Sequence, residues 1–130
     1  MESLQVRTGQ ISLQILDDYG EVRGVFKFNP QDIESAKRVF ALQAELPSKQ
    51  AEFEARIETV TDDNDKMEVL SDIVDYFNNA IDDCFGKGSS AVLFGGAKTL
   101  SMYEDFFEGI LPYYQKASEK RVGKYKKRGK

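Results

Sequence analysis

Histidine is absent from this sequence of 130 residues, and its absence narrows what the protein can do. Histidine is the most common general base in enzymes and the most common metal ligand in proteins. Without it a Ser-His-Asp triad, a Cys-His pair and a His-ligated zinc site are all excluded. We therefore expect a protein that is not an enzyme, and we predict no catalytic residue, no metal site and no cofactor.

Cysteine and long apolar stretches are also scarce. The single cysteine, Cys84, excludes an internal disulfide. No apolar run approaches the ~20 residues that a membrane-spanning helix needs. The first ten residues, MESLQVRTGQ, have neither the basic start nor the apolar stretch of a signal peptide. These features favour a cytoplasmic protein without a membrane partner.

Three segments partly match the sequence motifs of ligand-binding loops, one for calcium and two for phosphate, but none of these motifs is complete. The acidic run at residues 62–65 lacks the central glycine and the final glutamate of a calcium loop. Residues 86–90 and 95–99 are glycine-rich but lack the spacing, or the glycine before lysine, of a phosphate loop. We therefore expect neither calcium nor nucleotide to bind.

Charge is distributed unevenly along the chain. The net charge is -4, but residues 116–130 carry eight basic residues and one acidic residue. This tail therefore has a net charge of +7, and residues 1–115 have -11. A basic tail on an acidic body can bind nucleic acid or an acidic partner, or can simply be solvated. The sequence shows no helix-turn-helix signal and no aromatic RNA-binding motif, which argues against nucleic acid.

The first 28 residues have the alternating pattern of β-strands. Apolar and polar residues alternate over residues 11–15 and again over residues 22–28. Residues 17–20, Asp-Asp-Tyr-Gly, lie between these runs and are typical of a turn. We predict a hairpin whose apolar face packs on the rest of the chain, because an isolated hairpin is only marginally stable in water.

The apolar spacing changes to that of a helix at Asn29-Pro30. Asn29 can cap a helix, and Pro30 suits its first position. Pro47 is expected to end or kink this helix, because the proline ring clashes with the preceding turn. The helical spacing then resumes and predicts a second, more exposed helix that extends to Val60.

Two further helices are predicted in the second half of the chain. One has the most regular apolar stripe, from Met67 to Cys84, with Gly86 as its C-terminal cap. The last follows Ser101 and should be kinked at Pro112. The expected fold class is therefore α+β and mostly α. We expect one domain, 1–130, made of a β-hairpin region (1–28), a helical body of three to five helices (30–115) and a basic tail (116–130).

The last predicted helix carries more apolar side chains than one buried face requires. Four of them, Tyr103, Phe107, Leu111 and Tyr114, lie well around the helix from the others. A helix that is apolar on most sides is buried on most sides, either at the centre of its domain or against another chain. Tyrosine is enriched at interfaces because it combines apolar area with a polar tip. These four residues are our candidate partner-binding site, and in the absence of a client we expect them to be buried against a second copy of the chain in a homo-oligomer.

Short motifs occur along the chain in a recognisable order. After the hairpin comes Val25-Phe26-Lys27-Phe28-Asn29-Pro30-Gln31-Asp32, followed by Cys84-Phe85-Gly86-Lys87-Gly88, Leu93-Phe94-Gly95-Gly96, Phe106-Phe107, Pro112-Tyr113 and the Lys/Arg tail. This order resembles that of tail assembly chaperones of siphoviruses and related prophages of Gram-positive bacteria. The resemblance covers most of the chain and rests on order and spacing, not on a catalytic signature.

The resemblance implies a non-enzymatic role in the cytoplasm of the bacterial host. Such chaperones bind the long, helical tape measure protein, keep it soluble and promote assembly of tail tube protein around it. They are not expected in mature virions. Two other roles stay open. One is a head–tail adaptor or other structural component, which would be retained in virions, and the other is a nucleic-acid-binding regulator that uses the basic tail.

A longer product is also implied by the resemblance. In many phages a programmed frameshift near the end of this gene adds a domain that recruits tail tube protein. Consecutive lysine codons are A-rich and can form the slippery run, and Lys126-Lys127 lies where that run is expected. We predict a slippery run within codons 124–128 and a larger product that shares this N-terminus. A gene with no such run, and with no open frame in the shifted register, would contradict the prediction.

Overall fold

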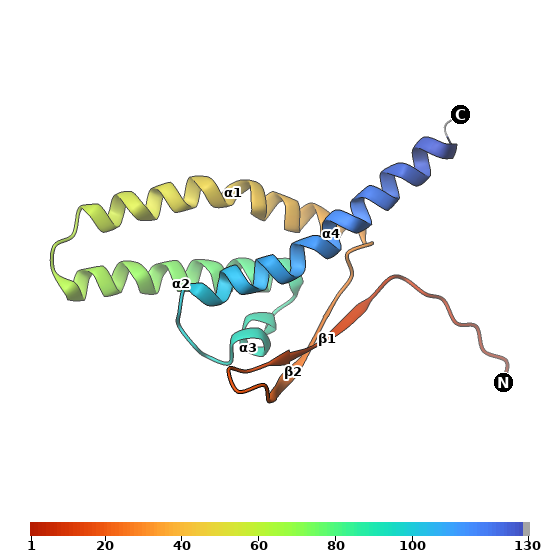
Figure 1. Cartoon of the computed structure of the whole chain (residues 1–130), viewed down its shortest axis with the longest axis horizontal. Coiled ribbons are helices and arrows are strands. Elements are labelled where there is room, and N and C mark those ends of the chain that lie inside the picture. The colour runs from red at the N-terminus through yellow and green to blue at the C-terminus, as the bar shows by residue number, and fades with distance from the viewer. Residues whose placement is uncertain (129–130) are drawn as a thin grey trace.

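The computed structural model describes residues 1–128, and it describes side chains up to residue 123. Two strands precede four helices: β1 (Ile11–Leu16), β2 (Val22–Phe28), α1 (Ile33–Glu58), α2 (Asp63–Phe85), α3 (Ser89–Phe94) and α4 (Ser101–Arg128). The expected fold class, mostly α with an N-terminal hairpin, is confirmed. In Figure 1, α1 and α2 form a long antiparallel pair and α4 crosses them obliquely. The hairpin lies along one side of the helices, next to α3.

The hairpin forms where the alternating pattern predicts it. β1 and β2 pair antiparallel, with Ile11 opposite Phe28. The Asp17 carboxylate accepts hydrogen bonds from the backbone N–H groups of Tyr19 and Glu21, which closes the turn. Residues 1–10 form no regular secondary structure, so the strands occupy a shorter segment than the expected residues 1–28.

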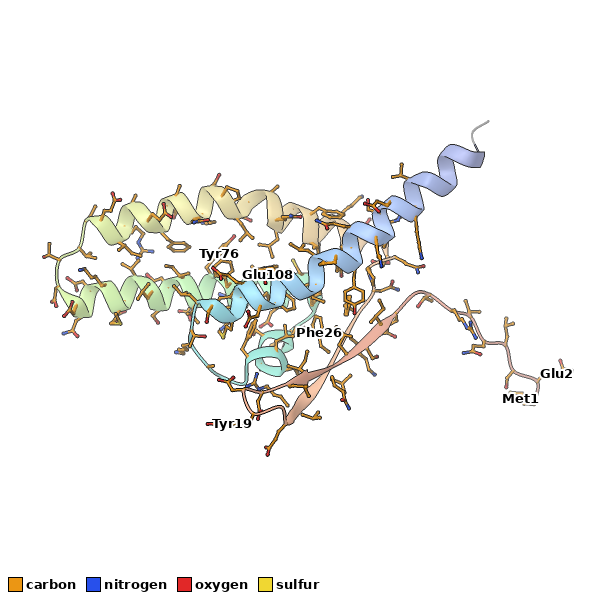
Figure 2. The ribbon with its side chains drawn as sticks, viewed as in Figure 1. Met1, Glu2, Tyr19, Phe26, Tyr76 and Glu108 are labelled. Atoms are coloured by element: carbon orange, nitrogen blue, oxygen red, sulfur yellow. The ribbon has the colours of Figure 1, made fainter. Side chains whose placement is uncertain are left out.

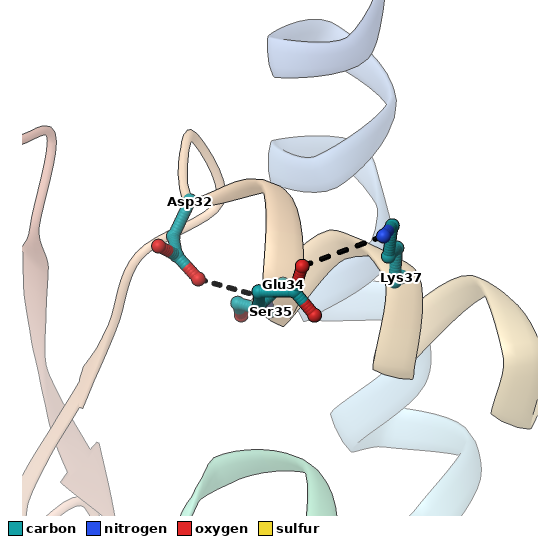
Figure 3. Close-up of polar contacts among 4 residues, drawn as sticks. All are labelled: Asp32, Glu34, Ser35 and Lys37. Carbon is teal, nitrogen blue, oxygen red and sulfur yellow. Dashed lines mark hydrogen bonds and ion pairs between the residues drawn. The ribbon is translucent and has the colours of Figure 1, made fainter.

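Helix α1 begins three residues later than the Asn29-Pro30 motif suggests. Asn29 instead closes a turn, because its side-chain oxygen accepts a hydrogen bond from the Gln31 N–H at 3.0 Å. The N-cap is Asp32, whose carboxylate accepts a hydrogen bond from the Ser35 N–H at 2.8 Å (Figure 3). The first turn also holds an ion pair between Glu34 and Lys37 (Figure 3).

The expectation that Pro47 divides this region into two helices is wrong. Helix α1 continues through Pro47 to Glu58. Proline removes one backbone hydrogen bond, the one to the carbonyl four residues earlier. Here Pro47 and Gln43 are both exposed, so water can satisfy the free carbonyl. Helix α4 likewise continues through the exposed Pro112, and it includes most of the basic tail.

Aromatic side chains join the hairpin to the helices. The Phe26 ring lies 5.3 Å from that of Phe85 on α2 and 5.8 Å from that of Phe106 on α4, both edge to face. Phe28 stacks on Tyr114 of α4 at 6.1 Å. These residues belong to one hydrophobic core. No helix within residues 1–128 is long and apolar enough to cross a membrane.

A smaller cluster holds the far ends of α1 and α2 together. Phe53 of α1 packs there with Val69 and Ile73 of α2. An ion pair between Arg56 and Asp72, at 2.7 Å, joins the same two helices at the surface. The long helix pair is therefore stabilised along its length, including the part that lies beyond the hairpin.

Replacing Phe26 by alanine should strongly destabilise the fold. The substitution removes a buried ring that contacts both α2 and α4, and a large-to-small change of this kind costs about 3–5 kcal/mol. The loss would be measured as the free energy of unfolding in urea, followed by circular dichroism. Tyr19→Ala is the matched control, because Tyr19 lies at the tip of the hairpin and is 92% exposed (Figure 2). Equal losses in the two variants would show that the hairpin does not depend on this contact.

Candidate functional site

An apolar groove of about 660 Å³ runs between α1, α2 and α4. On α1, the lining residues recur at intervals of four and three, so their side chains lie on one face of the helix over five turns. The residues with this spacing are Val39, Gln43, Leu46, Gln50, Phe53 and Ile57, and Lys49 and Glu54 also line this side. On α4, Tyr103, Phe107 and Leu111 recur every four residues and line the other side of the groove.

Helix α2 connects the two sides of the groove. Its residue Ile73 clusters with Phe53 of α1. One turn later, Phe77 stacks on Tyr103 of α4, with ring centroids 4.6 Å apart. Both α2 residues line the groove, so α2 forms its floor while α1 and α4 form its walls.

The groove is open because its apolar lining is only partly covered. Leu46 and Ile57 on α1, and Phe107 and Leu111 on α4, are each half-buried. Leu100, just before α4, is 42% exposed. Within the described part of the chain, no further element lies over these side chains. A contiguous apolar patch that is rimmed by polar residues and stays in contact with water is typical of a binding site.

Only part of the predicted partner-binding site lies open in the groove. Tyr103 and Tyr114 are 3% and 0% exposed, so both belong to the core of this chain. Phe107 and Leu111 are the two predicted residues that remain accessible. Tyr114 does not line the groove at all, so its inclusion in the predicted site is wrong. The reason is that Phe28 of the hairpin covers the face of α4 on which Tyr114 lies.

The two buried tyrosines keep their hydroxyls hydrogen-bonded. Tyr103 donates to the Asn78 side-chain oxygen at 2.8 Å, and the Tyr114 hydroxyl lies 2.7 Å from that of Ser35. Burial, together with the charge of Asp75, raises the pKa of Tyr103 to about 12. Burial also raises the pKa of Tyr114. Both side chains are therefore neutral at physiological pH and act as structural groups.

Cys84 also has a structural environment. The thiol is buried, and its Sγ lies 3.6 Å from the Arg38 carbonyl oxygen. Burial raises the pKa of this thiol, which keeps it protonated and therefore a poor nucleophile. Among the described residues, no three His, Cys, Asp or Glu side chains are placed so that they could hold a metal ion.

Sequence reasoning missed the α1 side of the groove. The expected break at Pro47 would place Val39 and Leu46 on one helix and Phe53 and Ile57 on another. Because α1 is continuous, all four residues lie along one face of a single helix. The signal that could have found them is the spacing itself, which keeps its phase across the proline.

Carboxylates stand along the edges of the groove. Glu54 lies on the α1 side, and Glu104 and Glu108 lie on the α4 side; all three are exposed. Each follows directly after an apolar lining residue, so it lies about 100° farther around its helix, toward water. The groove is thus apolar inside and acidic at its rim.

Comparison with known protein families gives a match over most of the chain. The sequence model of a family described as a family of unknown function, DUF6673, matches residues 24–130. The matched region starts within β2 and includes all four helices and every residue that lines the groove. No curated protein and no solved structure matches the chain.

Charge substitutions should distinguish the core residues of α4 from the residues that line the groove. Tyr114→Glu places a carboxylate in a fully buried position and should unfold the protein, with a loss of about 3–5 kcal/mol. Leu111→Glu can point its carboxylate into water and should keep the native helical content, with a loss of about 1 kcal/mol. Circular dichroism and thermal melting would measure both. Similar losses in the two variants would contradict the assignment of Leu111 to an open groove.

Proposed function

The chain belongs to the DUF6673 family, whose function is unknown, and we propose that it is a non-enzymatic chaperone of phage tail assembly. Its client is the tape measure protein, which it binds in the cytoplasm of the bacterial host and releases before the virion is complete. Tail tube protein then assembles around the released client. The observation that carries the proposal is the open apolar groove between α1, α2 and α4.

The dimensions of the groove suit a helical client. The α1 stripe extends from Val39 to Ile57, which at 1.5 Å per residue is about 27 Å. A helix of five turns can lay one apolar face along such a groove, as in other helix-in-groove complexes. A long helical client carries apolar stripes that aggregate unless they are covered. Covering them requires contact area but no catalytic group.

Helix α4 also gives a place for a second partner. Its C-terminal end projects away from the α1–α2 pair (Figure 1). A domain added there by a frameshift would lie beyond the end of α4, so it would leave the groove free for the client. Such a longer form would recruit tail tube protein, while the shorter form would hold the client alone.

Co-expression with the tape measure protein tests the proposal. The chain should keep this client in the soluble fraction, and Phe107→Glu or Leu111→Glu should reduce the soluble client several-fold, because a charge in the groove opposes burial of an apolar stripe. Val22→Glu is the matched control, because Val22 is exposed on the hairpin, away from the groove. Both groove variants must fold, as judged by circular dichroism.

Two results would argue against this role. Folded groove variants that solubilise the client as well as the unmodified chain would show that the groove does not bind it. Recovery of the chain in purified virions would favour a structural component, such as a head–tail adaptor, over a chaperone.

A further inference from the structure

We propose that the groove selects amphipathic helices whose apolar stripe is flanked on both sides by lysine or arginine. This inference rests on the proposed function, in which the groove holds a client helix. It adds the chemistry of that helix, and the argument comes from the charges at the rim.

The rim carries negative charge on both walls. Glu54 lies on α1, and Glu104 and Glu108 lie one turn apart on α4. Like charges at positions i and i+4 of a helix repel each other. A cation placed at this edge would relieve that repulsion.

The described side chains do not neutralise this rim. Lys49 is the basic residue that lines the groove, but its ammonium group is already paired with Glu52 at 3.4 Å and lies over the Tyr76 ring. Among residues 1–123, no ion pair includes Glu54, Glu104 or Glu108, and the Glu54 carboxylate accepts a hydrogen bond from the neutral Gln50 side chain at 3.2 Å. Their negative charge is therefore available to a partner.

The positions of the carboxylates determine where the partner's charges should be. Glu54 follows Phe53, and Glu108 follows Phe107, so each acid flanks an apolar residue that lines the groove. A client helix with its apolar stripe between these rings would bring its two flanks to the two acidic edges. Lysine and arginine fit there, because their methylene chains cover apolar surface while their charged ends stay in water. An acidic flank would meet like charge on both walls and be rejected.

Three designed peptides of about 18 residues test this selectivity. They share one leucine stripe with helical spacing and differ only in their flanking residues, which are lysine, glutamine or glutamate. Each would carry a fluorophore and be titrated with the full chain by fluorescence anisotropy. We expect the lysine peptide to bind about tenfold more tightly than the glutamine peptide, and the glutamate peptide to bind most weakly. The differences should shrink at about 0.5 M salt, where charges are screened.

Variants of the rim carboxylates test whether these groups cause the preference for the lysine peptide. Glu104→Gln with Glu108→Gln should bring the lysine and glutamine peptides to within about twofold of each other, while the glutamine peptide binds as before. The matched control is Asp18→Asn with Glu21→Gln, which removes the same charge from the exposed hairpin turn. A lysine preference that the control pair abolishes, or that the rim pair leaves intact, would overturn the proposal.

Failure of this inference can be told apart from failure of the proposed function. Equal binding of all three peptides, lost in Leu111→Glu, would keep the groove as a helix-binding site and overturn its charge selectivity. No binding of any peptide, together with undiminished solubilisation of the client by Leu111→Glu, would overturn both. Light scattering that shows a dimer, which Leu111→Glu converts to a monomer, would assign the groove to a second copy of this chain and overturn the proposal.

Discussion

The contact of Phe26 and Phe28 with the rings of α2 and α4 holds the molecule together. A two-stranded sheet has little stability alone, and α4 joins the body mainly through its large aromatic side chains. The hairpin therefore fixes α4 against α2, and α4 in turn covers the apolar face of the hairpin. Neither element would hold its position without the other, so the orientation of α4 depends on this small group of rings.

The same contact determines what the rest of α4 can do. With Phe106, Ile110 and Tyr114 turned into the core, the neighbouring residues Phe107 and Leu111 face the space beside α1. One helix thus serves two purposes. Its first face stabilises the fold, and the adjacent face forms a wall of the groove. An excess of apolar residues on α4 is explained by this double use.

Charge is arranged along α4 in agreement with the helix dipole. Glu104 lies in the first turn and the basic residues lie toward the C-terminal end, so both ends are favoured by the dipole. Glu104 therefore contributes to helix stability as well as to the rim of the groove, whereas Glu108 lies beyond the first turn and contributes to the rim alone.

Local features of this protein were determined by its sequence. The Asp17 turn and the glycine end of α2 at Gly86 are both set by neighbouring residues, and the structure has each of them. The absence of histidine also restricts chemistry whatever the fold. The period of the apolar residues was enough to distinguish strand from helix.

Tertiary structure decided the effect of Pro47, and it decided which of the four candidate residues on α4 are buried and which remain accessible. A proline removes one helical hydrogen bond and crowds the preceding turn. Helix α1 continues through Pro47 because water can satisfy the free carbonyl and both flanks pack against α2. Likewise, the spacing of residues in the sequence gives the direction in which a side chain points from its own helix, but not which neighbouring element it meets. Tyr114 meets the hairpin and is buried, whereas Leu111, less than one turn away, is only partly covered by its neighbours. That difference comes from contacts between segments far apart in the chain, and it is what turns an apolar helix into both a core and an open groove.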